Sequence, residues 1–273
     1  LILIKTVVND NGGTKGVSDF PLFIDQSSVV SGEANAVTIG AHTATEIADA
    51  GYAASSWGGD CAADGTITLA LAEEKTCTII NDDIGPKLTV TKVVINDNGG
   101  SLDVSDFPLF VDQTSVISGI ENSFDADSYS ISETGNTGYV ASISGDCDAQ
   151  GNVTLGLAET KSCTITNDDQ PGLLIVQKVL INNNGGIATI ANFSFQINGG
   201  GAVFFEADGQ NDIVVNTGIY SVTEPAVDGY ATSYANCTDL VIPNGGSATC
   251  IITNDDIALA TRTQGFWQTH TAY

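Results

Sequence analysis

The chain has 273 residues and a formal net charge of −25, with 33 Asp and Glu against 8 Lys and Arg. This charge excludes nucleic-acid backbones and anionic membrane surfaces as expected partners, and no apolar run approaches the roughly 20 residues that a membrane-spanning helix needs. With 30 Gly and many Val, Ile and Thr, the composition favours β-strands joined by tight turns. The chain has no Met and no signal peptide, so we expect a mature or trimmed product.

One apolar segment opens the chain and then recurs. Its copies are residues 1–13, 88–100 and 174–186, and their lysines recur at intervals of 87 and 86 residues. Each copy is followed about 75 residues later by a stretch that runs from a cysteine to Asn-Asp-Asp. A fixed period with a marked beginning and end predicts tandem domains of one design. The predicted boundaries are 1–84, 85–170 and 171–256, followed by a tail, 257–273, that does not repeat the pattern.

Within a repeat, the predicted elements are short strands separated by turn clusters. The first strand ends in Asn-Asp-Asn-Gly-Gly, or Asn-Asn-Asn-Gly-Gly in the third copy, and Asn and Gly tolerate the positive φ of turns. A second strand follows with Pro21 or Pro108, which places it at a sheet edge or marks its start. A Glu-x5-Tyr segment, a strand carrying a cysteine and the final strand complete the repeat. This spacing predicts an all-β chain of immunoglobulin-like β-sandwiches.

Six cysteines fall two to a repeat, separated by 16, 16 and 13 residues, as on two neighbouring strands of a hairpin. Metal ligands are expected closer together and beside histidines, and the chain has only two histidines. We therefore predict three disulfides within repeats and an extracellular or cell-surface location. The pairs are Cys61 with Cys77, Cys147 with Cys163, and Cys237 with Cys250.

Alternation of side chains along a strand places one polar residue of each of three strands on the apolar, core-facing side. In the third repeat these residues are Lys178, Glu224 and Asn254. A buried ammonium is costly unless it is compensated, and Lys178 is the only Lys or Arg of its repeat. The lysine is therefore expected to have a specific partner in the core.

The first-strand lysine, the Glu-x5-Tyr segment and the last-strand asparagine resemble those of collagen-adhesin B-type and SpaA-like prealbumin-fold domains of microbial surface proteins. The resemblance covers residues 1 to about 256 and implies prealbumin-like β-sandwiches. It also implies that the lysine amine attacks the asparagine amide, assisted by a protonated carboxyl group, to form an isopeptide bond and release ammonia. Such chemistry needs a neutral amine and a neutral acid, which apolar burial favours.

Carried over, the self-crosslinking sets are Lys5, Glu46 and Asn81; Lys92, Glu133 and Asn167; and Lys178, Glu224 and Asn254. The alternative is that each lysine only pairs with its glutamate while each asparagine opens an Asn-Asp-Asp turn. The first repeat departs furthest from the pattern, because His42 and Ala44 replace larger apolar residues. Self-processing is not turnover, so we do not expect an enzyme.

Two weaker signals have simpler explanations. The Asn-Asp clusters could supply oxygen ligands to calcium, but none has the spacing of an EF-hand loop and turn chemistry explains them, so no cofactor is expected. Asn152, Asn192 and Asn236 match the glycosylation acceptor pattern, which often occurs by chance.

The resulting hypothesis is an extracellular stalk or surface-filament subunit. The apolar start, Leu1, Ile2, Leu3 and Ile4, and the tail with Phe266 and Trp267 suggest head-to-tail association of copies by strand addition. The alternative is an adhesin that binds a host or neighbouring-cell protein or glycan, for which the aromatic tail is the best support. No nucleophile elbow, phosphate loop or zinc motif appears.

Overall fold

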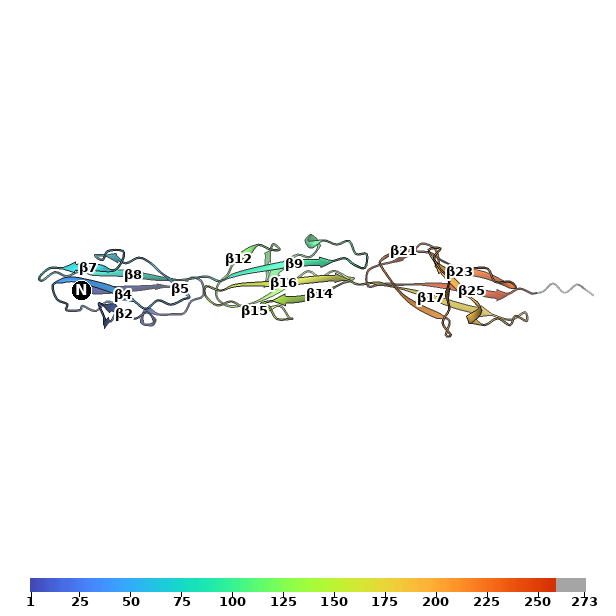
Figure 1. The fold of residues 1–273 in the computed structure, drawn as a ribbon, viewed down its shortest axis with the longest axis horizontal. Helices are drawn as coiled ribbons and strands as arrows, with labels where there is room; N and C mark the ends of the chain where they lie inside the picture. The colour runs from blue at the N-terminus through green and yellow to red at the C-terminus, as the bar shows by residue number, and fades with distance from the viewer. Residues whose placement is uncertain (259–273) are drawn as a thin grey trace, which may run out of the picture. The chain divides into compact units, whose positions relative to one another are not determined.

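The computed structural model describes residues 1–258, so Phe266 and Trp267 of the predicted docking tail lie outside the described residues. As predicted, the fold is all-β, and the only helices in residues 1–258 are the single 3-10 turns η1, η2 and η3 (Figure 1). Among the described residues, no helix has the length and apolar character needed to cross a membrane.

In the first repeat, two four-stranded sheets enclose the core. Their orders are β1-β8-β5, with β6 also paired to β8, and β3-β2-β4-β7. The elements are β1 (Ile2–Val8), η1 (Val17–Asp19), β2 (Leu22–Ile24), β3 (Ser27–Val29), β4 (Gly40–Glu46), β5 (Tyr52–Ala54), β6 (Gly58–Gly59), β7 (Thr66–Leu69) and β8 (Thr76–Asp83).

The second repeat has sheets of order β12-β9-β16-β14 and β11-β10-β13-β15. The elements are β9 (Lys87–Ile95), η2 (Val104–Asp106), β10 (Leu109–Val111), β11 (Thr114–Val116), β12 (Glu121–Ser123), β13 (Ser128–Glu133), β14 (Tyr139–Gly145), β15 (Asn152–Thr154) and β16 (Thr160–Asp169).

The third repeat has one four-stranded sheet, β20-β17-β25-β23, and faces it with two smaller sheets, β19-β18-β22 and β21-β24. The elements are β17 (Gly172–Ile181), η3 (Ile190–Asn192), β18 (Ser194–Ile197), β19 (Val203–Phe204), β20 (Gln210–Val215), β21 (Gly218–Tyr220), β22 (Val222–Thr223), β23 (Tyr230–Ala235), β24 (Leu240–Ile242) and β25 (Ser247–Asp256).

The first and last strands of a repeat lie side by side. β1 pairs with β8 in parallel, and β17 pairs with β25 in parallel (Figure 1). Lys178 is opposite Ile252 in this register, so Asn254 is the next residue of β25 on the same face. The pairing therefore places the lysine and the asparagine on neighbouring strands of one sheet.

Each repeat has its own apolar core, formed by alternate residues of its strands. In β17, for example, Leu174 and Val176 are fully buried, whereas the flanking Val179 is 42% exposed. By compactness, however, the chain divides into two units, and the second repeat contributes to both. One unit contains Leu1–Val93, Val104–Thr134 and Ser142–Thr166, and the other contains Val94–Asp103, Gly135–Ala141 and the chain from Asn167 onward.

Three details of the predicted elements can be compared with the structure. Pro21 directly precedes β2 and Pro108 directly precedes β10, so these prolines mark strand starts and the edge alternative was wrong. Asn81 does not open a turn, because β8 continues through Asp83. The three disulfides pair as predicted, but Cys61, Cys147 and Cys237 each lie just after a strand, β6, β14 or β23, rather than in one.

Candidate functional site

The three predicted lysines lie in the apolar cores. The side chains of Lys5, Lys92 and Lys178 are 0% exposed. Each amine meets the predicted glutamate: Lys5 pairs with Glu46, Lys178 pairs with Glu224, and Lys92 Nζ lies 2.8 Å from Glu133 Oε2; these ion pairs satisfy the buried charges. Burial lowers the pKa of all three lysines below 10.5, and the paired glutamate opposes this shift without cancelling it.

The third repeat brings all three of its predicted residues together. Lys178 Nζ donates to Glu224 Oε2 and to Asn254 Oδ1, and the glutamate side chain is 0% exposed. Thr232 completes the cluster: its hydroxyl accepts from Asn254 Nδ2 at 3.1 Å and donates to Glu224 Oε1 at 3.4 Å. The amine thus lies against the amide carbonyl that it would attack, with a carboxyl group beside it.

In the first repeat the amide of the asparagine has fewer hydrogen bonds than in the third. Asn81 is 0% exposed, and neither its Oδ1 nor its Nδ2 has a hydrogen-bond partner among the described residues. Of its two predicted partners, Lys5 is hydrogen-bonded only to Glu46. In the second repeat Lys92 Nζ also lies 3.4 Å from the carbonyl oxygen of Ile165, and Asn167 is buried two residues further along the same strand.

Sequence reasoning missed the aromatic ring that covers each amine. Lys5 Nζ lies 4.7 Å from the ring centroid of Phe20, Lys92 Nζ lies 4.7 Å from that of Phe107, and Lys178 Nζ lies 4.0 Å from that of Phe193. These rings are at most 1% exposed and follow η1, η2 and η3 directly. They exclude water from the amine, which is the desolvation that lowers its pKa. The sequence does contain an indication of this ring, because Phe recurs at this position in all three copies.

Sequence reasoning also missed a lock at the end of the first strand. The Asp83 carboxylate accepts the backbone N–H groups of Asp10, Asn11 and Gly13, and Tyr52 Oη donates to Asn9 Oδ1 at 2.6 Å. The third repeat repeats the arrangement with Asp256 and Tyr230.

The lock uses the last acid of Asn-Asp-Asp and the tyrosine of Glu-x5-Tyr. Burial alone would raise the pKa of Asp83, but the backbone N–H groups outweigh it and hold that pKa below 3.8. The same balance holds for the equivalent carboxyl groups of Asp169 and Asp256. The lock fastens the turn after the first strand to the end of the last strand.

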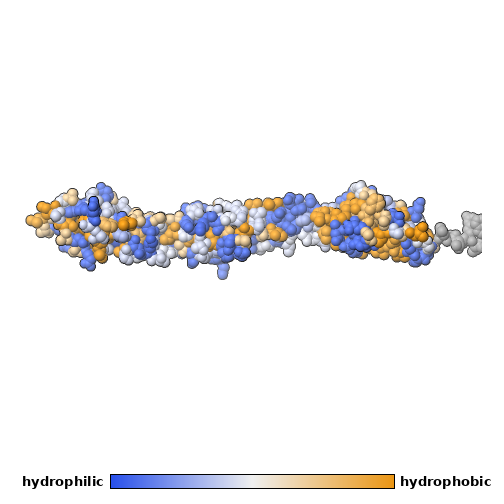
Figure 2. All heavy atoms as spheres, turned by 60° about the horizontal axis from the view of Figure 1, so that its bottom comes forward, coloured by the Kyte–Doolittle hydropathy of each residue, from blue (hydrophilic) through white to orange (hydrophobic). Residues whose placement is uncertain are grey.

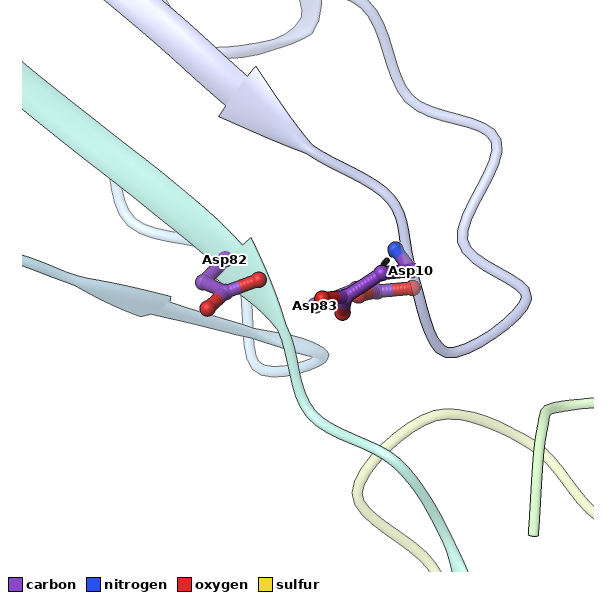
Figure 3. Close-up of side chains that lie close together, drawn as sticks. All are labelled: Asp10, Asp82 and Asp83. Atoms are coloured by element: carbon purple, nitrogen blue, oxygen red, sulfur yellow. Dashed lines mark hydrogen bonds between the residues drawn. The ribbon is translucent and has the colours of Figure 1, made fainter.

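Two groups of acidic side chains have the oxygen chemistry that calcium prefers. In one, Asp10, Asp82 and Asp83 place one carboxylate oxygen each within 4.8 Å of one another (Figure 3). The other is the equivalent set in the second repeat, Asp97, Asp168 and Asp169. Both oxygens of Asp83 accept backbone N–H groups, so its burial is explained without an ion.

The three glycosylation candidates are all exposed. Asn152 Nδ2 donates to the Asp148 carboxylate, and Asn192 Oδ1 accepts from Thr189. Asn236 directly precedes a disulfide cysteine and has φ of 53°. Their modification stays a prediction.

The apolar start of the chain is part of the first core. Leu1 and Leu3 are 6% and 0% exposed, whereas Ile4 is 40% exposed on the other face of β1. β1 is the edge strand of its sheet, and the backbone of residues 32–35 covers the part of this edge that begins at Leu1. Strand addition at this edge stays a prediction.

The chain consists of β-sandwich repeats. In each repeat the first and last strands are neighbours and a polar cluster lies between them, and these features define the class of protein to which the chain belongs. The model of the prealbumin-like fold domain matches it three times, over residues 1–79, 83–165 and 169–256. The chain therefore belongs to the prealbumin-like fold domain family. No curated protein matches it in sequence.

Among solved structures, the chain is similar to the Bacillus anthracis TIE protein, with 18% identity and a TM-score of 0.51 over 93% of this chain and 50% of that one. It thus spans about half the length of that relative. Two B repeat units of the collagen binding protein of Staphylococcus aureus match 93% of this chain and 74% of their own at 13% identity and a TM-score of 0.26. A C-terminal fragment of the pilus adhesin SpaC of Lactobacillus rhamnosus GG matches 65% of this chain and 100% of its own at 13% identity and a TM-score of 0.34.

Proposed function

We propose that the chain is an extracellular structural protein, a stalk or the subunit of a surface filament, whose repeats are stabilised by disulfides and by Lys–Asn isopeptide bonds. The observation that carries this proposal is the third-repeat cluster, in which Lys178 contacts both Glu224 and Asn254 between the first and last strands. Force applied at the two ends of a repeat would load the hydrogen bonds between these strands in shear. A covalent bond between the strands would carry that load instead.

In the proposed reaction, neutral Lys178 Nζ attacks the side-chain carbonyl carbon of Asn254. The new C–N bond forms, the C–N bond to the amide nitrogen breaks, and that nitrogen leaves as ammonia with a proton lost by the amine. Glu224, which contacts the amine and lies beside the amide through Thr232, is placed to move this proton. The apolar surroundings and the ring of Phe193 favour the neutral amine, and fixed proximity lowers the barrier.

No metal or cofactor is needed for this reaction, and each chain reacts once, so the proposed protein is not an enzyme. The disulfides favour an extracytoplasmic location.

The test is the intact mass of the native and the reduced chain, followed by peptide mapping. We expect the loss of one ammonia in the third repeat, localised to a branched peptide that joins Lys178 to Asn254. A full complement of asparagine amide in all three repeats would refute the isopeptide bonds. Lys178→Arg is the matched control, because it keeps the charge and removes the nucleophilic amine.

An adhesin is the second candidate. Hydrophobic residues are prominent on the surface of the third repeat (Figure 2). Ile219 and Val241, which are 64% and 67% exposed, are cross-strand neighbours on β21 and β24. Contiguous exposed apolar patches mark interaction sites. This candidate predicts saturable binding of a cell-surface protein or glycan, and the loss of that binding when both residues are replaced by Ser.

A further inference from the structure

Consecutive repeats meet through two main-chain hydrogen bonds, and this joint occurs once in each compact unit. In the first unit, Ala126 N donates to Asn11 O at 2.8 Å and Ala158 N donates to Ile84 O at 2.7 Å. In the second unit, the equivalent positions repeat the bonds: Thr217 N donates to Asn98 O at 2.8 Å and Gly245 N donates to Gln170 O at 3.0 Å. We call the two carbonyl groups the acceptor end of a repeat and the two N–H groups the donor end of the next.

A glycine at the acceptor end leaves room for the donor turn. A Cβ atom on Gly51 would lie 3.0 Å from Leu157 Cβ, and one on Gly138 would lie 2.6 Å from Asn244 Cβ. The second distance is shorter than real Cβ contacts, so the donor turn can approach because glycine has no side chain. The turn of the first strand is in equally close contact, since a Cβ on Gly12 would lie 2.7 Å from Ala126 N.

The third repeat has a formed acceptor end that no described residue occupies. Its carbonyl groups belong to Asn184 and Ile257, and its glycine is Gly229. Ile257 N donates to Gly229 O at 2.9 Å, as Ile84 N does to Gly51 O. Asn184 is held by Asp256 as Asn11 is held by Asp83. Yet a Cβ on Gly229 would meet nothing within 4 Å among the described residues.

A hollow of about 560 Å³ lies at this acceptor end, lined in part by Asn184, Gly229 and Ile257. Ile187, which also lines it, is 94% exposed.

The first repeat has the complementary donor end. Its residues are Ile39, Leu71 and Ala72, at the positions of Ala126, Leu157 and Ala158. Ala72 has φ of 61°, Ala158 has φ of 59° and Gly245 has φ of 64°, so the turn already has the conformation that it adopts in a joint. Leu71 is 86% exposed, whereas the equivalent Leu157 is half-buried. Hydrophobic residues accordingly gather at the left end of Figure 2, at the tip of the first repeat.

We propose that the donor end of the first repeat of one copy docks on the acceptor end of the third repeat of a second copy, re-forming the joint seen within the chain. Ile39 N and Ala72 N would donate to Asn184 O and Ile257 O, and Leu71 would cover Gly229. A second copy is the occupant because its first repeat carries a donor turn of the conformation found in both joints within the chain, and its exposed Leu71 corresponds to Leu157, which lies against Gly51. The inference specifies the partner surface of the proposed filament and rests on that function.

The test uses two variants of the full chain in sedimentation velocity, from about 10 μM to about 1 mM, which covers dissociation constants of that range. Leu71→Glu places a charge on the donor turn. Gly229→Asn adds a side chain where the joint allows none, and Asn tolerates the φ of 82° found there. The matched controls are Ile117→Glu, at an apolar residue that is 72% exposed, and Gly199→Asn, at an open glycine with φ of 70°.

We expect the wild-type chain and both controls to associate as concentration rises, and each variant alone to bind itself at least about tenfold more weakly, a cost of about 1.4 kcal/mol. An equal mixture of the two variants retains one intact donor end and one intact acceptor end, and should form dimers and nothing larger. A wild-type chain that stays monomeric throughout the range overturns the inference, as does a variant that assembles like wild type.

If the tail made the contact between copies instead, all four variants would still assemble. This outcome distinguishes docking by the tail from the proposed joint. Occupation of the acceptor end by the chain's own tail would leave the wild type monomeric. The isopeptide test reads mass alone, so the proposed crosslinks and this interface can fail independently.

Discussion

The first and third repeats contain the same three polar residue types in their cores, but bond them differently. Asn254 is held between Lys178 and Thr232, whereas the amide of Asn81 has no hydrogen-bond partner among the described residues. The cause lies on the neighbouring strand. In the register of β5 with β8, Ala54 is opposite Asn81; in that of β23 with β25, Thr232 is opposite Asn254. Thr232 thus supplies a hydroxyl group to Asn254 Nδ2, whereas Ala54 has none to offer Asn81.

Burial of the lysine is therefore not sufficient for the proposed reaction. Both amines are buried, both meet a glutamate and both lie over a phenylalanine ring. Of these two repeats, only the third has a hydrogen bond from the amine to the amide carbonyl. Four changes test this difference, and they follow in order of expected effect.

Lys178→Met should have the largest effect. It removes the proposed crosslink and leaves Glu224 buried without a cation, which costs about 3–5 kcal/mol. Hydrogen exchange read by mass spectrometry should show lost protection in β17 and β25, with the first repeat unchanged. The control is Lys161→Met, at a lysine whose side chain is 28% exposed. Full retention of protection in the third repeat would contradict the role of the cluster.

Removing a disulfide should affect the two repeats almost equally. The bridges close loops of 13 residues in the third repeat and 16 in the first, and each contributes about 3 kcal/mol in the chain-entropy model. Replacing Cys237 and Cys250 by Ala should therefore cost as much unfolding free energy as replacing Cys61 and Cys77. Clearly unequal losses, measured by local hydrogen exchange, would show that the repeats differ in more than their polar clusters.

Acid should weaken the turn locks of both repeats. Asp83 and Asp256 have pKa values held below 3.8 in the folded chain, so the unfolded chain binds protons first as the pH falls. The stability that they provide is complete well above pH 3.8 and is lost as the pH falls through the lower, folded pKa values. Thermal unfolding between pH 7 and pH 2 should show this loss, and Asp256→Asn should flatten it for the third repeat alone. A third repeat that keeps the acid dependence of the wild type would refute the lock.

The smallest effect is expected when the hydroxyl group is removed from the third repeat or added to the first. Thr232→Ala should cost about 1 kcal/mol, the value of one hydrogen bond, and should slow formation of the proposed crosslink. Ala54→Thr should supply the missing partner of Asn81 Nδ2. Intact mass as a function of time after refolding measures both, with Thr223→Ala, an exposed threonine of the same repeat, as control. Equal crosslinking rates in wild type and Thr232→Ala would contradict the comparison.

Much of this arrangement could be predicted, because it depends on periodicity. The alternation of side chains predicted that Lys178, Val176 and Leu174 share a buried face, and they do. The Asn and Gly residues predicted the turn after the first strand, where Gly12 has φ of 87°. The cysteine spacing predicted the three disulfides.

What could not be predicted depends on contacts between strands whose register the sequence does not state. Thr232 lies 22 residues from Asn254, and nothing local to either residue indicates that they meet. Asp83 looked like part of a polar turn because acidic residues are rarely buried, and its burial depends on N–H groups about 70 residues away. Cys61 was expected in a strand, but the chain bends there after the two residues of β6.

Both joints between repeats have two main-chain hydrogen bonds, and the second joint adds one from the side chain of Asn244 to that of Asp169. The two bonds that the joints share are made by peptide groups, so they depend little on the surrounding side chains, provided that one position stays a glycine and one turn keeps its left-handed residue. A gene encoding such an array could therefore gain or lose whole units of about 86 residues by recombination, and each new boundary would already fit. The number of repeats, and with it the length of the array, could then change under selection, while the surface of each repeat is free to change.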